Sequence, residues 1–557
     1  MNILLFILFV FSQLCQVLLS YKILVYSQTL TRSHVILNAK IAEALASDGH
    51  NVTILEVEYF EPLSEFEGSN AKGVKKISVK SNLNKAREKI EERLNYVYFN
   101  EATTWSIIRD YENDNHFQRT ANEFCEVFLD TQKHLVKQLE SENFDLFIGE
   151  QINFCGTGLS YLFKIPIHIL LVSCPIQEHV SSLLGLPFPS SYVPSIYGIP
   201  MNDKMNIKQR FSNLIATLMH ERSFYYGIEH LNEIFKQRFG LVKEKYKRRG
   251  EISNYPNIKN IIKSTPLVFV NVDEFVEFPR PIHSNIVYIG GLGFEKINNK
   301  NKQLSEPYLN EIKKGKLGTV YFSLGSLLNT STLPNEFIKN IFETFKSLED
   351  WHFIVKISEG DLYSKELVNN CSNIFLTNWA PQRAILEHPQ TKLFISHGGY
   401  NSLIESALAA CPIISFGFFA EQRRNSLIPE RNGWGLSFNK ALLLKGKDEF
   451  LAIIKTILED PKFTEGAKRL SKILANKPFT AREKLLKNIR FLELNGGKLP
   501  ELMPESRNLN IFVLYNLDIL AILIITIIGL LILFYLLIIK LFYNLIINFK
   551  LRKNKKE

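Results

Sequence analysis

Polar side chains suited to ligand binding are concentrated between Asn378 and Asn425, in NWAPQRAILEHPQTKLFISHGGYNSLIESALAACPIISFGFFAEQRRN. A strand-like stretch ends at Ser396 and runs into His397-Gly398-Gly399, and we expect a helix to start near Asn401. Glycines at a strand-to-helix turn let backbone N–H groups and the positive end of the helix approach an anionic phosphate. His397 can donate a further hydrogen bond to a diphosphate.

Three more polar side chains follow this turn. Glu405 comes one helical turn after Asn401, where a carboxylate can accept hydrogen bonds from the two hydroxyls of a ribose. Glu421 and Gln422 follow the next expected strand, at the edge of an open α/β sheet where ligands gather. A carboxylate beside a carboxamide suits a sugar, whose hydroxyls need both acceptors and donors. Each signal alone is weak, because an HGG sequence is more often only a turn.

The segments around these residues alternate between strands and helices. A strand from Lys22, a helix at 33–47 and a strand at 51–55 form a β-α-β opening, which implies a parallel, doubly wound sheet. We therefore expect an α/β fold in which two Rossmann-like domains face a cleft, with a linker near residues 250–285. Short apolar runs predict the other strands at 144–150, 165–173, 319–325, 352–357, 374–379, 392–397 and 412–416, and a helical run at about 460–496.

Both ends of the chain carry apolar segments. Residues 1–20 are predicted to be a signal peptide cleaved before Tyr21, with an uncleaved anchor as the alternative. Residues 519–539 are uncharged and long enough for a transmembrane helix. Lys and Arg follow this stretch, so the positive-inside rule predicts a cytosolic tail and a lumenal body. Lys553 and Lys555 have the spacing of a KxKxx signal, which resembles the tails of resident endoplasmic-reticulum proteins; a plain polybasic flank is the alternative.

The net charge of +10 is partly a property of this tail, because residues 540–557 hold six Lys or Arg and one acid. The body is less basic than the total suggests, which argues against nucleic acid as a partner. The chain has 557 residues, which favours two domains with accessory segments.

The cysteines predict neither a disulfide framework nor a zinc site. Cys15 would leave with the signal peptide, and the remaining cysteines are odd in number and scattered: Cys125, Cys155, Cys174, Cys371 and Cys411. Asn51, Asn329 and Asn370 head N-x-S/T sequons, so a lumenal body could be glycosylated where they are exposed.

The order NWxPQ, HGGxNSxxE, P and EQ resembles the donor-binding signature of the UDP-glycosyltransferases, and the chain is identified as a member, closest in layout to the membrane-bound UDP-glucuronosyltransferases. The resemblance spans from about Tyr21 to the tail. It implies the GT-B fold, with the acceptor on the first lobe and the UDP-sugar on the second. The family usually has Asp where this chain has Glu421. The implied donor site comprises Trp379 on uracil with Gln382 nearby, His397 and Ser326 at the diphosphate, Gly399, Asn401 and Ser402 lining the site, Glu405 on the ribose, and Glu421 with Gln422 on the sugar.

The resemblance also covers SHVILNAKIAEALASDGHNVTIL, residues 33–55, where the family's catalytic histidine falls on His34. An acceptor hydroxyl is a poor nucleophile until a base removes its proton, and an imidazole oriented by a carboxylate suits that task. The family's partner is an Asp at the end of FDxxxxD. Here that position is Glu150, which is longer by one methylene. The bland alternative for His34 is a helix-capping histidine.

These assignments imply an inverting transfer of glucose or glucuronate from the UDP-sugar to a hydroxyl of a small lipophilic acceptor. The sequence contains no D-x-D motif, so we expect no metal and no other cofactor. Whether the chain forms a homo-oligomer stays open. The implied divisions are signal peptide 1–20, acceptor-binding domain 21–265, UDP-sugar-binding domain 266–496, lumenal linker 497–518, transmembrane helix 519–539 and cytosolic tail 540–557.

The sequence disfavours two other functions. A membrane-anchored binding protein on an inactive glycosyltransferase scaffold is disfavoured because His34, Glu150, Glu405 and Gln422 are all retained. A nicotinamide oxidoreductase lacks support because no G-x-G-x-x-G follows the first strand.

The acceptor cannot be read from the sequence. Residues 185–198 form a loop whose Phe188, Tyr192 and Tyr197 either line a pocket or merely pack. For the donor, vertebrate glucuronosyltransferases are expected to carry an Arg shortly before an FPxP motif, and counting back from Pro279 places Asn271 there. An amide lacks the charge that binds a carboxylate, so UDP-glucose should serve at least as well as UDP-glucuronate unless Arg280 reaches the site instead.

Overall fold

The computed structural model describes residues 20–60, 63, 71–81, 83, 99, 106–239, 255–294, 304–326, 328–369 and 371–554. Two compact units are present, one ending at Met503 and the other beginning at Pro504. The signal-peptide prediction (except Ser20), the sequon at Asn370 and the end of the tail from residue 555 lie outside the described residues.

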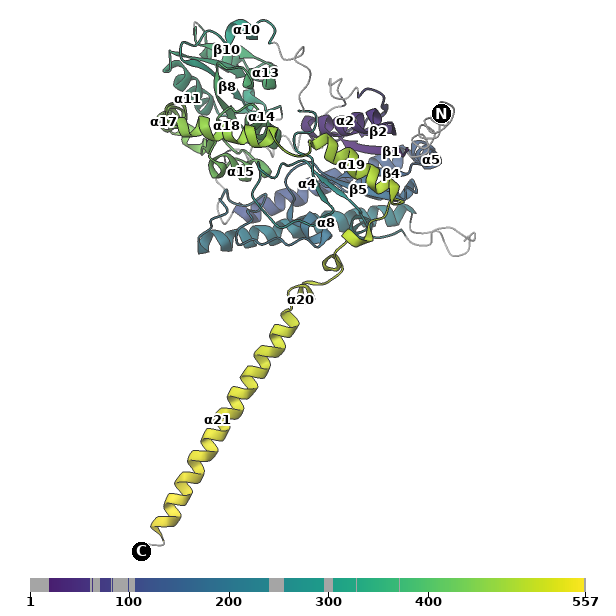
Figure 1. The fold of residues 1–557 in the computed structure, drawn as a ribbon, viewed down its shortest axis with the longest axis vertical. Coiled ribbons are helices and arrows are strands. Elements are labelled where there is room, and N and C mark those ends of the chain that lie inside the picture. Colours follow the sequence, from purple (N-terminus) through teal and green to yellow (C-terminus); the bar gives the residue numbers. More distant parts are fainter. Residues whose placement is uncertain are drawn as a thin grey trace, which may run out of the picture. The chain divides into compact units, whose positions relative to one another are not determined.

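The first sheet has seven strands in the order β3-β2-β1-β4-β5-β6-β7, all paired in parallel (Figure 1). Its strands are β1 Lys22–Gln28, β2 Asn51–Val57, β3 Lys75–Val79, β4 Leu146–Glu150, β5 Ile167–Val172, β6 Val268–Val270 and β7 Ile286–Tyr288. The helices of this part are α2 Arg32–Ser47, α4 Ser106–Thr131, α5 Lys133–Ser141, α6 Cys155–Leu162, α7 Glu178–Leu184, α8 Ile207–Phe239 and α9 Ile258–Lys263.

Helices cover both faces of this sheet, as a parallel sheet requires. Successive side chains of a strand point to opposite faces, so β1 feeds two separate cores. Ile23 belongs to one core with Ile41 of α2, whereas Leu24 belongs to the other with Phe124 of α4. Continuous burial along the strand explains its uninterrupted apolar sequence.

The second sheet has six strands in the order β10-β9-β8-β11-β12-β13, again all parallel. This confirms the predicted α/β fold with two Rossmann-like domains. The strands are β8 Gly318–Ser323, β9 Trp351–Lys356, β10 Ile374–Thr377, β11 Thr391–Ser396, β12 Ile413–Ser415 and β13 Gly435–Ser437. The helices are α10 Tyr308–Glu311, α11 Asn335–Lys346, α12 Leu362–Leu367, α13 Gln382–Leu386, α14 Tyr400–Leu408, α15 Glu421–Asn425, α16 Ile428–Asn432, α17 Asp448–Glu459 and α18 Pro461–Ala475.

The boundary between the lobes differs from the predicted one at residue 265. β6 pairs with β5 and β7 pairs with β6, so the first sheet continues to Tyr288, and the predicted linker at 250–285 is wrong. The helical run expected at 460–496 is two helices, α18 and α19 (Ala481–Leu494). Pro478 lies between them, and Thr480 with Glu483 forms a capping box that starts α19. α19 then packs on the first lobe, where Leu485, Ile489 and Leu492 join its core.

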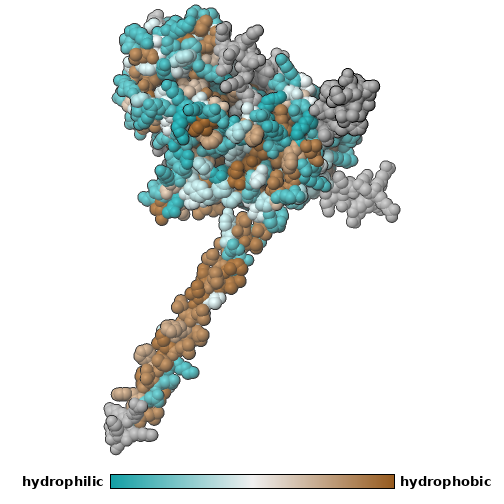
Figure 2. Space-filling model, in the orientation of Figure 1, coloured by the Kyte–Doolittle hydropathy of each residue, from teal (hydrophilic) through white to brown (hydrophobic). Residues whose placement is uncertain are grey.

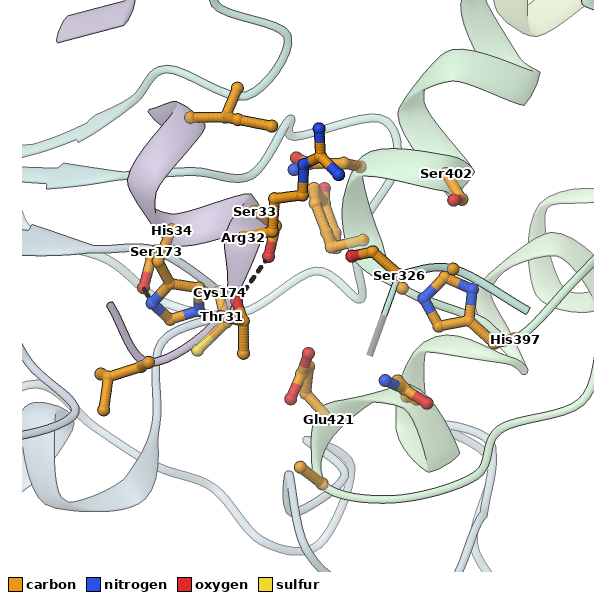
Figure 3. Close-up of a pocket in the computed structure, with 18 of the residues that line it drawn as sticks. Thr31, Arg32, Ser33, His34, Ser173, Cys174, Ser326, His397, Ser402 and Glu421 are labelled. Atoms are coloured by element: carbon orange, nitrogen blue, oxygen red, sulfur yellow. Dashed lines mark hydrogen bonds between the residues drawn. The ribbon is translucent and has the colours of Figure 1, made fainter. Parts of the chain in front are cut away.

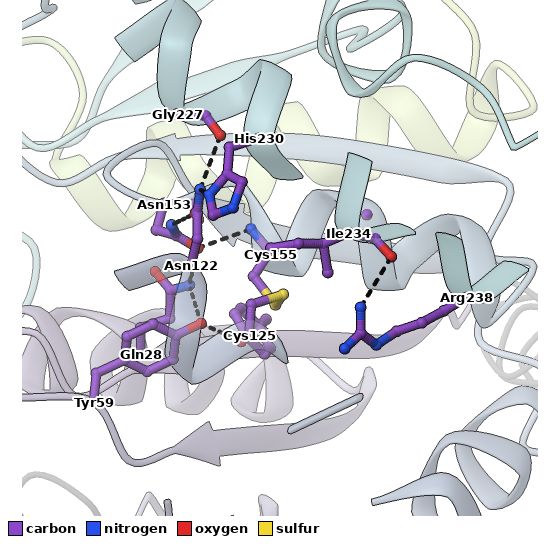
Figure 4. Close-up of a disulfide and its surroundings, with 12 residues drawn as sticks. Gln28, Tyr59, Asn122, Cys125, Asn153, Cys155, Gly227, His230, Ile234 and Arg238 are labelled. Atoms are coloured by element: carbon purple, nitrogen blue, oxygen red, sulfur yellow. Dashed lines mark hydrogen bonds between the residues drawn. A yellow bond between two sulfur atoms is a disulfide. The ribbon is translucent and has the colours of Figure 1, made fainter. Parts of the chain in front are cut away.

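One cysteine prediction is also wrong. Cys125 of α4 and Cys155 of α6 form a disulfide, whereas Cys174, Cys371 and Cys411 are free (Figure 4). The bond sits beside a hydrogen-bonded polar cluster in which Asn153 accepts from the backbone N–H of Cys155. It closes a chain separation of 30 residues, which contributes on the order of 3–4 kcal/mol in the loop-entropy description.

The second unit contains α20 (Ile511–Leu514) and the long helix α21 (Leu517–Lys553). Residues 517–551 are long and apolar enough to cross a membrane, and Figure 2 shows this helix as an almost continuous apolar surface. The helix extends beyond the predicted span of 519–539, because the apolar sequence LFYNLIINF continues after Lys540 without a helix breaker. The residues predicted as tail are therefore helical as far as Lys553.

Candidate active site

A cavity of about 810 Å³ lies between the two lobes and is lined by both of them. The carboxyl ends of β1, β5 and β6 reach it from the first sheet, and those of β8, β9 and β11 from the second, which is where open α/β sheets bind ligands. Figure 3 shows side chains of the two lobes facing each other across this space. All the predicted site residues line it except Glu150: His34, Ser326, Trp379, Gln382, His397, Gly399, Asn401, Ser402, Glu405, Glu421 and Gln422.

Glu150 lies directly behind His34. α2 begins at Arg32 and carries His34 in its first turn, while β4 ends at Glu150. Nδ1 of His34 is 2.6 Å from Oε2 of Glu150, whose side chain is fully buried. Because Nδ1 faces the carboxylate, Nε2 is left to act toward the cavity. The alternative of a capping histidine fails here, since the imidazole is bound to a carboxylate.

The electrostatics of His34 favour a base. Burial by itself lowers the pKa of His34, but the carboxylates of Glu150 and Glu421 more than offset burial, so the pKa lies above its usual value. A carboxylate that stabilises the charged imidazolium also stabilises the state formed when the base accepts a proton.

Two residues that sequence reasoning missed hold Glu150 in place. Nδ2 of Asn38 donates to Oε1 of Glu150 at 2.5 Å, and Oγ of Ser173 donates to Oε2 at 3.1 Å. Ser173 Oγ is also 3.2 Å from Nδ1 of His34. Asn38 lies one helical turn after His34 on the same face of α2, and only this spacing in the sequence could have indicated its role. Ser173 follows β5, at the same sheet edge as Glu150.

The HGG turn has the predicted form. β11 ends at Ser396, Gly398 has φ +86°, and Gly399 is the residue before α14. A Cβ on Gly399 would lie 2.4 Å from Nε2 of His397, so the close packing of the imidazole requires glycine here. Burial, with help from the nearby Lys356 charge, lowers the pKa of His397 to about 4. His397 is therefore neutral at pH 7 and can donate only one hydrogen bond.

Lys356, at the end of β9, is a cavity-lining cation that sequence reasoning missed. Its Nζ donates to the carbonyl of Gly325 at 2.9 Å, beside Ser326 and close to His397. Burial, assisted by Arg32, lowers the pKa of Lys356 to about 8. The only feature of the sequence that could have indicated this role is the position of the lysine at the carboxyl end of an expected strand.

Trp379 of the second lobe lines the cavity with its side chain about half exposed. The guanidinium of Arg32 lies 4.2 Å from the ring centroid, which joins the two lobes across the cavity. The amide of Gln382 donates to the carboxylate of Glu405 and, at 3.4 Å, to Oγ of Ser402. Burial raises the pKa of Glu405, although that hydrogen bond and nearby cations oppose the rise.

Glu421 begins α15 and points into the space between His34 and His397 (Figure 3). Ala420 before it has φ +45°, an uncommon conformation for a residue with a Cβ and one that recurs at functional sites. Burial raises the pKa of Glu421, and the positive charge of His34 opposes that rise. The Glu421 carboxylate therefore lies between a histidine of the first lobe, His34, and one of the second, His397 (Figure 3).

Comparison with known proteins identifies the family. The sequence profile described as "UDP-glucoronosyl and UDP-glucosyl transferase" matches residues 21–556. The chain belongs to this family. The putative UDP-glucuronosyltransferase ugt-48 of Caenorhabditis elegans is 34% identical over 91% of this chain and 92% of its own length, and UDP-glucuronosyltransferase 3A2 of Homo sapiens is 29% identical over 86% and 85%.

The fold comparison agrees. The crystal structure of TcCGT1 in complex with UDP covers 86% of this chain and 100% of that chain, with a TM-score of 0.55 and 14% identity. At that identity the similarity shows the fold alone, which is the GT-B fold of glycosyltransferases. The chain is therefore an enzyme of the UDP-glycosyltransferase family with a GT-B fold.

In this UDP-glycosyltransferase, Asn271 also reaches the cavity. It directly follows β6, and its Nδ2 donates to Oδ1 of Asn401 and to the carbonyl of Ser173, both at 3.2 Å. Arg280 is not among the described residues that line the cavity. Its guanidinium instead donates to the carbonyl of Ile176 at 2.8 Å and to Ser181 Oγ at 2.7 Å.

The first-lobe end of the cavity mixes aromatic and polar walls. Of the three aromatic residues in the predicted 185–198 loop, Tyr197 lines the cavity. The ring of Phe188 instead lies 4.9 Å from the guanidinium of Arg280, and Tyr192 is exposed. Asp110 and Asp114 project from α4, where Asp110 pairs with Arg423 and Asp114 with the imidazole of His220. Among the described residues, no group of three or more His, Cys, Asp or Glu could hold a metal ion. The other first-lobe residues that line the cavity include Leu30, Phe60, Phe117, Gln118 and Phe224.

Proposed function

We propose that this enzyme transfers a sugar from a UDP-sugar to a hydroxyl of a small lipophilic acceptor by a single inverting displacement. The observation that carries the proposal is the buried pair of His34 and Glu150 at the cavity wall, opposite the second-lobe residues Trp379 and Glu405. An inactive binding protein would not need this pair, and burying two ionisable groups costs desolvation free energy even when they are paired.

In the proposed reaction, Nε2 of His34 takes the proton of the acceptor hydroxyl as its oxygen bonds to the anomeric carbon of the sugar. The bond between that carbon and the β-phosphate oxygen breaks, and UDP leaves with the electron pair. Glu150 stabilises the imidazolium that forms. The α14 N-terminus, His397 and Lys356 would stabilise the departing diphosphate, which makes a metal unnecessary in the proposal.

The second lobe would bind the rest of the donor. Trp379 would stack on uracil with Gln382 beside it, and Ser326 with the HGG turn would contact the diphosphate. Glu405 would accept the ribose hydroxyls. Asn401 and Ser402 would complete the wall, while Glu421 and Gln422 would hold the sugar, whose hydroxyls need acceptors and donors.

For the donor sugar, we propose that UDP-glucose serves at least as well as UDP-glucuronate. Asn271 lines the cavity with an uncharged amide, and Arg280 is committed to hydrogen bonds elsewhere. A guanidinium can bind a carboxylate through two parallel hydrogen bonds, which an amide cannot reproduce.

For its location, we propose a type I protein of the endoplasmic-reticulum membrane, anchored by α21, with a lumenal body and a cytosolic tail. The disulfide between Cys125 and Cys155 supports an oxidising compartment. Protease added to sealed microsomes should trim only the short segment after about Lys540. Digestion of the body without detergent would overturn this orientation.

The test of the catalytic proposal is His34→Ala in the full-length enzyme, with UDP release measured for each donor in the presence of phenols, steroids and bile-acid-like alcohols. We expect loss of transfer by at least about 100-fold, in line with general-base catalysis, with UDP affinity retained because donor and base lie on different lobes. His134→Ala, at an exposed position of α5, is the matched control. Equal loss of transfer and UDP binding, or unchanged transfer, would refute the role.

A further inference from the structure

The N-terminal half of α8 exposes an apolar stripe. Ile207, Phe211, Leu214 and Leu218 are each between 44% and 74% exposed. At 100° per residue these four positions fall within an arc of about 60° on the helix. The opposite side of α8 is buried in the first lobe through residues such as Ala216 and Phe224. One face of the helix therefore packs inward, while a second apolar face has no covering element in the described part of the chain.

Basic residues border this stripe on both sides. Arg210 lies on one side, and Arg222 and Lys208 lie on the other; all three are exposed. Long cationic side chains beside an apolar stripe are typical of helices at a lipid–water interface, because the stems lie along the acyl region while the charges reach the phosphates. A cluster of exposed apolar side chains on one face of a folded enzyme is typical of an interaction site.

We propose that the α8 stripe, defined as Ile207, Phe211, Leu214 and Leu218, docks on the surface of a lipid bilayer that contains anionic lipid. The proposal rests on the membrane anchorage by α21 proposed above. Residues 495–516 join α19 to α21, so a bilayer that holds α21 is never further from the end of α19 than about 80 Å, the reach of a fully extended segment. The tether thus maintains a high effective concentration of the membrane surface near the stripe.

The charges argue for lipid over a second copy of the chain. A symmetric dimer through this face would bring the same patch of both copies together, and with it Arg210, Arg222 and Lys208 of each copy. Like charges opposed in this way repel, whereas the phosphates of anionic lipids attract them.

Docking would also affect the acceptor. α8 lines the cavity from within through Phe224, so the helix that contacts the lipid is the one that borders the proposed acceptor end. An acceptor dissolved in the bilayer would then have a short route to the cavity.

The test uses the full chain in nanodiscs of phosphatidylcholine and phosphatidylserine, with the fluorophore NBD attached at Phe211→Cys or Leu214→Cys. The background is Cys371→Ser, since Cys174 and Cys411 are buried. The matched control is Leu362→Cys on α12, where the native side chain is as exposed as Ile207. Quenching is measured with doxyl groups on the lipid chains and with aqueous iodide, and UDP binding is used to check the fold of each variant.

We expect doxyl lipids to quench positions 211 and 214 several-fold more than position 362, with protection from iodide. Lys208→Glu combined with Arg210→Glu should reduce this quenching in discs that contain phosphatidylserine. Doxyl quenching no greater than at position 362 would overturn the proposal. Protection from iodide without doxyl quenching would also overturn it, because a protein would then cover the stripe. Carbonate extraction tests α21 separately, so failure of the anchor and failure of the stripe are distinguishable.

Discussion

Asn38 binds the carboxylate oxygen of Glu150 that His34 does not use: Nδ2 of Asn38 is 2.5 Å from Oε1, while Nδ1 of His34 is 2.6 Å from Oε2. The hydroxyl of Ser173 also donates to Oε2 of Glu150. A glutamate has one more rotatable bond than the aspartate usual in this family, so it needs more contacts to stay in one orientation. Asn38 and Ser173 supply these contacts and are positioning residues.

We therefore expect Asn38→Leu and Ser173→Ala each to lower kcat by about 10-fold, the cost of losing a hydrogen bond to a charged group. UDP affinity should be unchanged, because the donor residues lie on the other lobe. Ser160→Ala is the matched control, since Ser160 is a buried serine whose hydroxyl donates to the carbonyl of Thr157 away from the cavity. Wild-type kcat in both positioning variants would remove them from the mechanism.

The pH dependence provides a second prediction. The base must be unprotonated, and the carboxylates of Glu150 and Glu421 hold the pKa of His34 above its usual value. Activity should therefore fall, as pH decreases, at a pH higher than for an ordinary histidine. Glu150→Gln removes the main contribution that raises the pKa, so this acidic limb should move to lower pH while the plateau rate drops.

The measurement for Glu150→Gln is kcat/KM from pH 5 to 9, with the drop at the plateau compared with that of His34→Ala. Turnover should fall less in Glu150→Gln, since the imidazole survives and loses only its orientation and charge stabilisation. An acidic limb that stays in place would show that another group titrates.

Local sequence patterns predicted much of the fold and the donor side of the site. The strand before His397 and the glycines after it are adjacent in the chain, so one short segment contains the information for the turn. Apolar runs likewise predicted β1, β4 and β8 within a few residues.

The errors concern contacts between distant segments. β6 and β7 are three residues each, too short for a periodic signal, and they join the first sheet only by pairing beyond β5. α19 follows the second lobe in the sequence but packs on the first lobe. Cys125 and Cys155 meet because α4 packs on the segment that follows β4, which their spacing does not reveal. The role of Asn38 depends on the position of Glu150, far away in sequence.

Glu405 offers a prediction about the nucleotide. If its carboxylate accepts hydrogen bonds from both ribose hydroxyls, the affinity of the wild-type enzyme for UDP should be at least about 10-fold higher than for 2′-deoxy-UDP. Glu405→Gln should weaken UDP binding and shrink that preference. Glu387→Gln is the control, since Glu387 lines the same cavity and pairs with Arg383. Calorimetry with the two nucleotides measures both effects, and an undiminished preference in Glu405→Gln would exclude the ribose role.

The donor sugar provides the last prediction. Asn271 follows β6 with its amide bound to Asn401 and to the carbonyl of Ser173, so a longer side chain at this position would extend into the cavity. Asn271→Arg should raise kcat/KM for UDP-glucuronate relative to UDP-glucose by about 10-fold, the worth of a charge-assisted bidentate hydrogen bond. Asn271→Gln lengthens the side chain without adding charge, so any shift it shares with Asn271→Arg is steric. A wild-type enzyme that strongly prefers glucuronate would contradict the donor proposal, because Arg280 is held by Ile176 and Ser181 and the amide alone cannot neutralise a carboxylate. A ratio that shifts only in the arginine variant would identify position 271 as the one that selects the sugar.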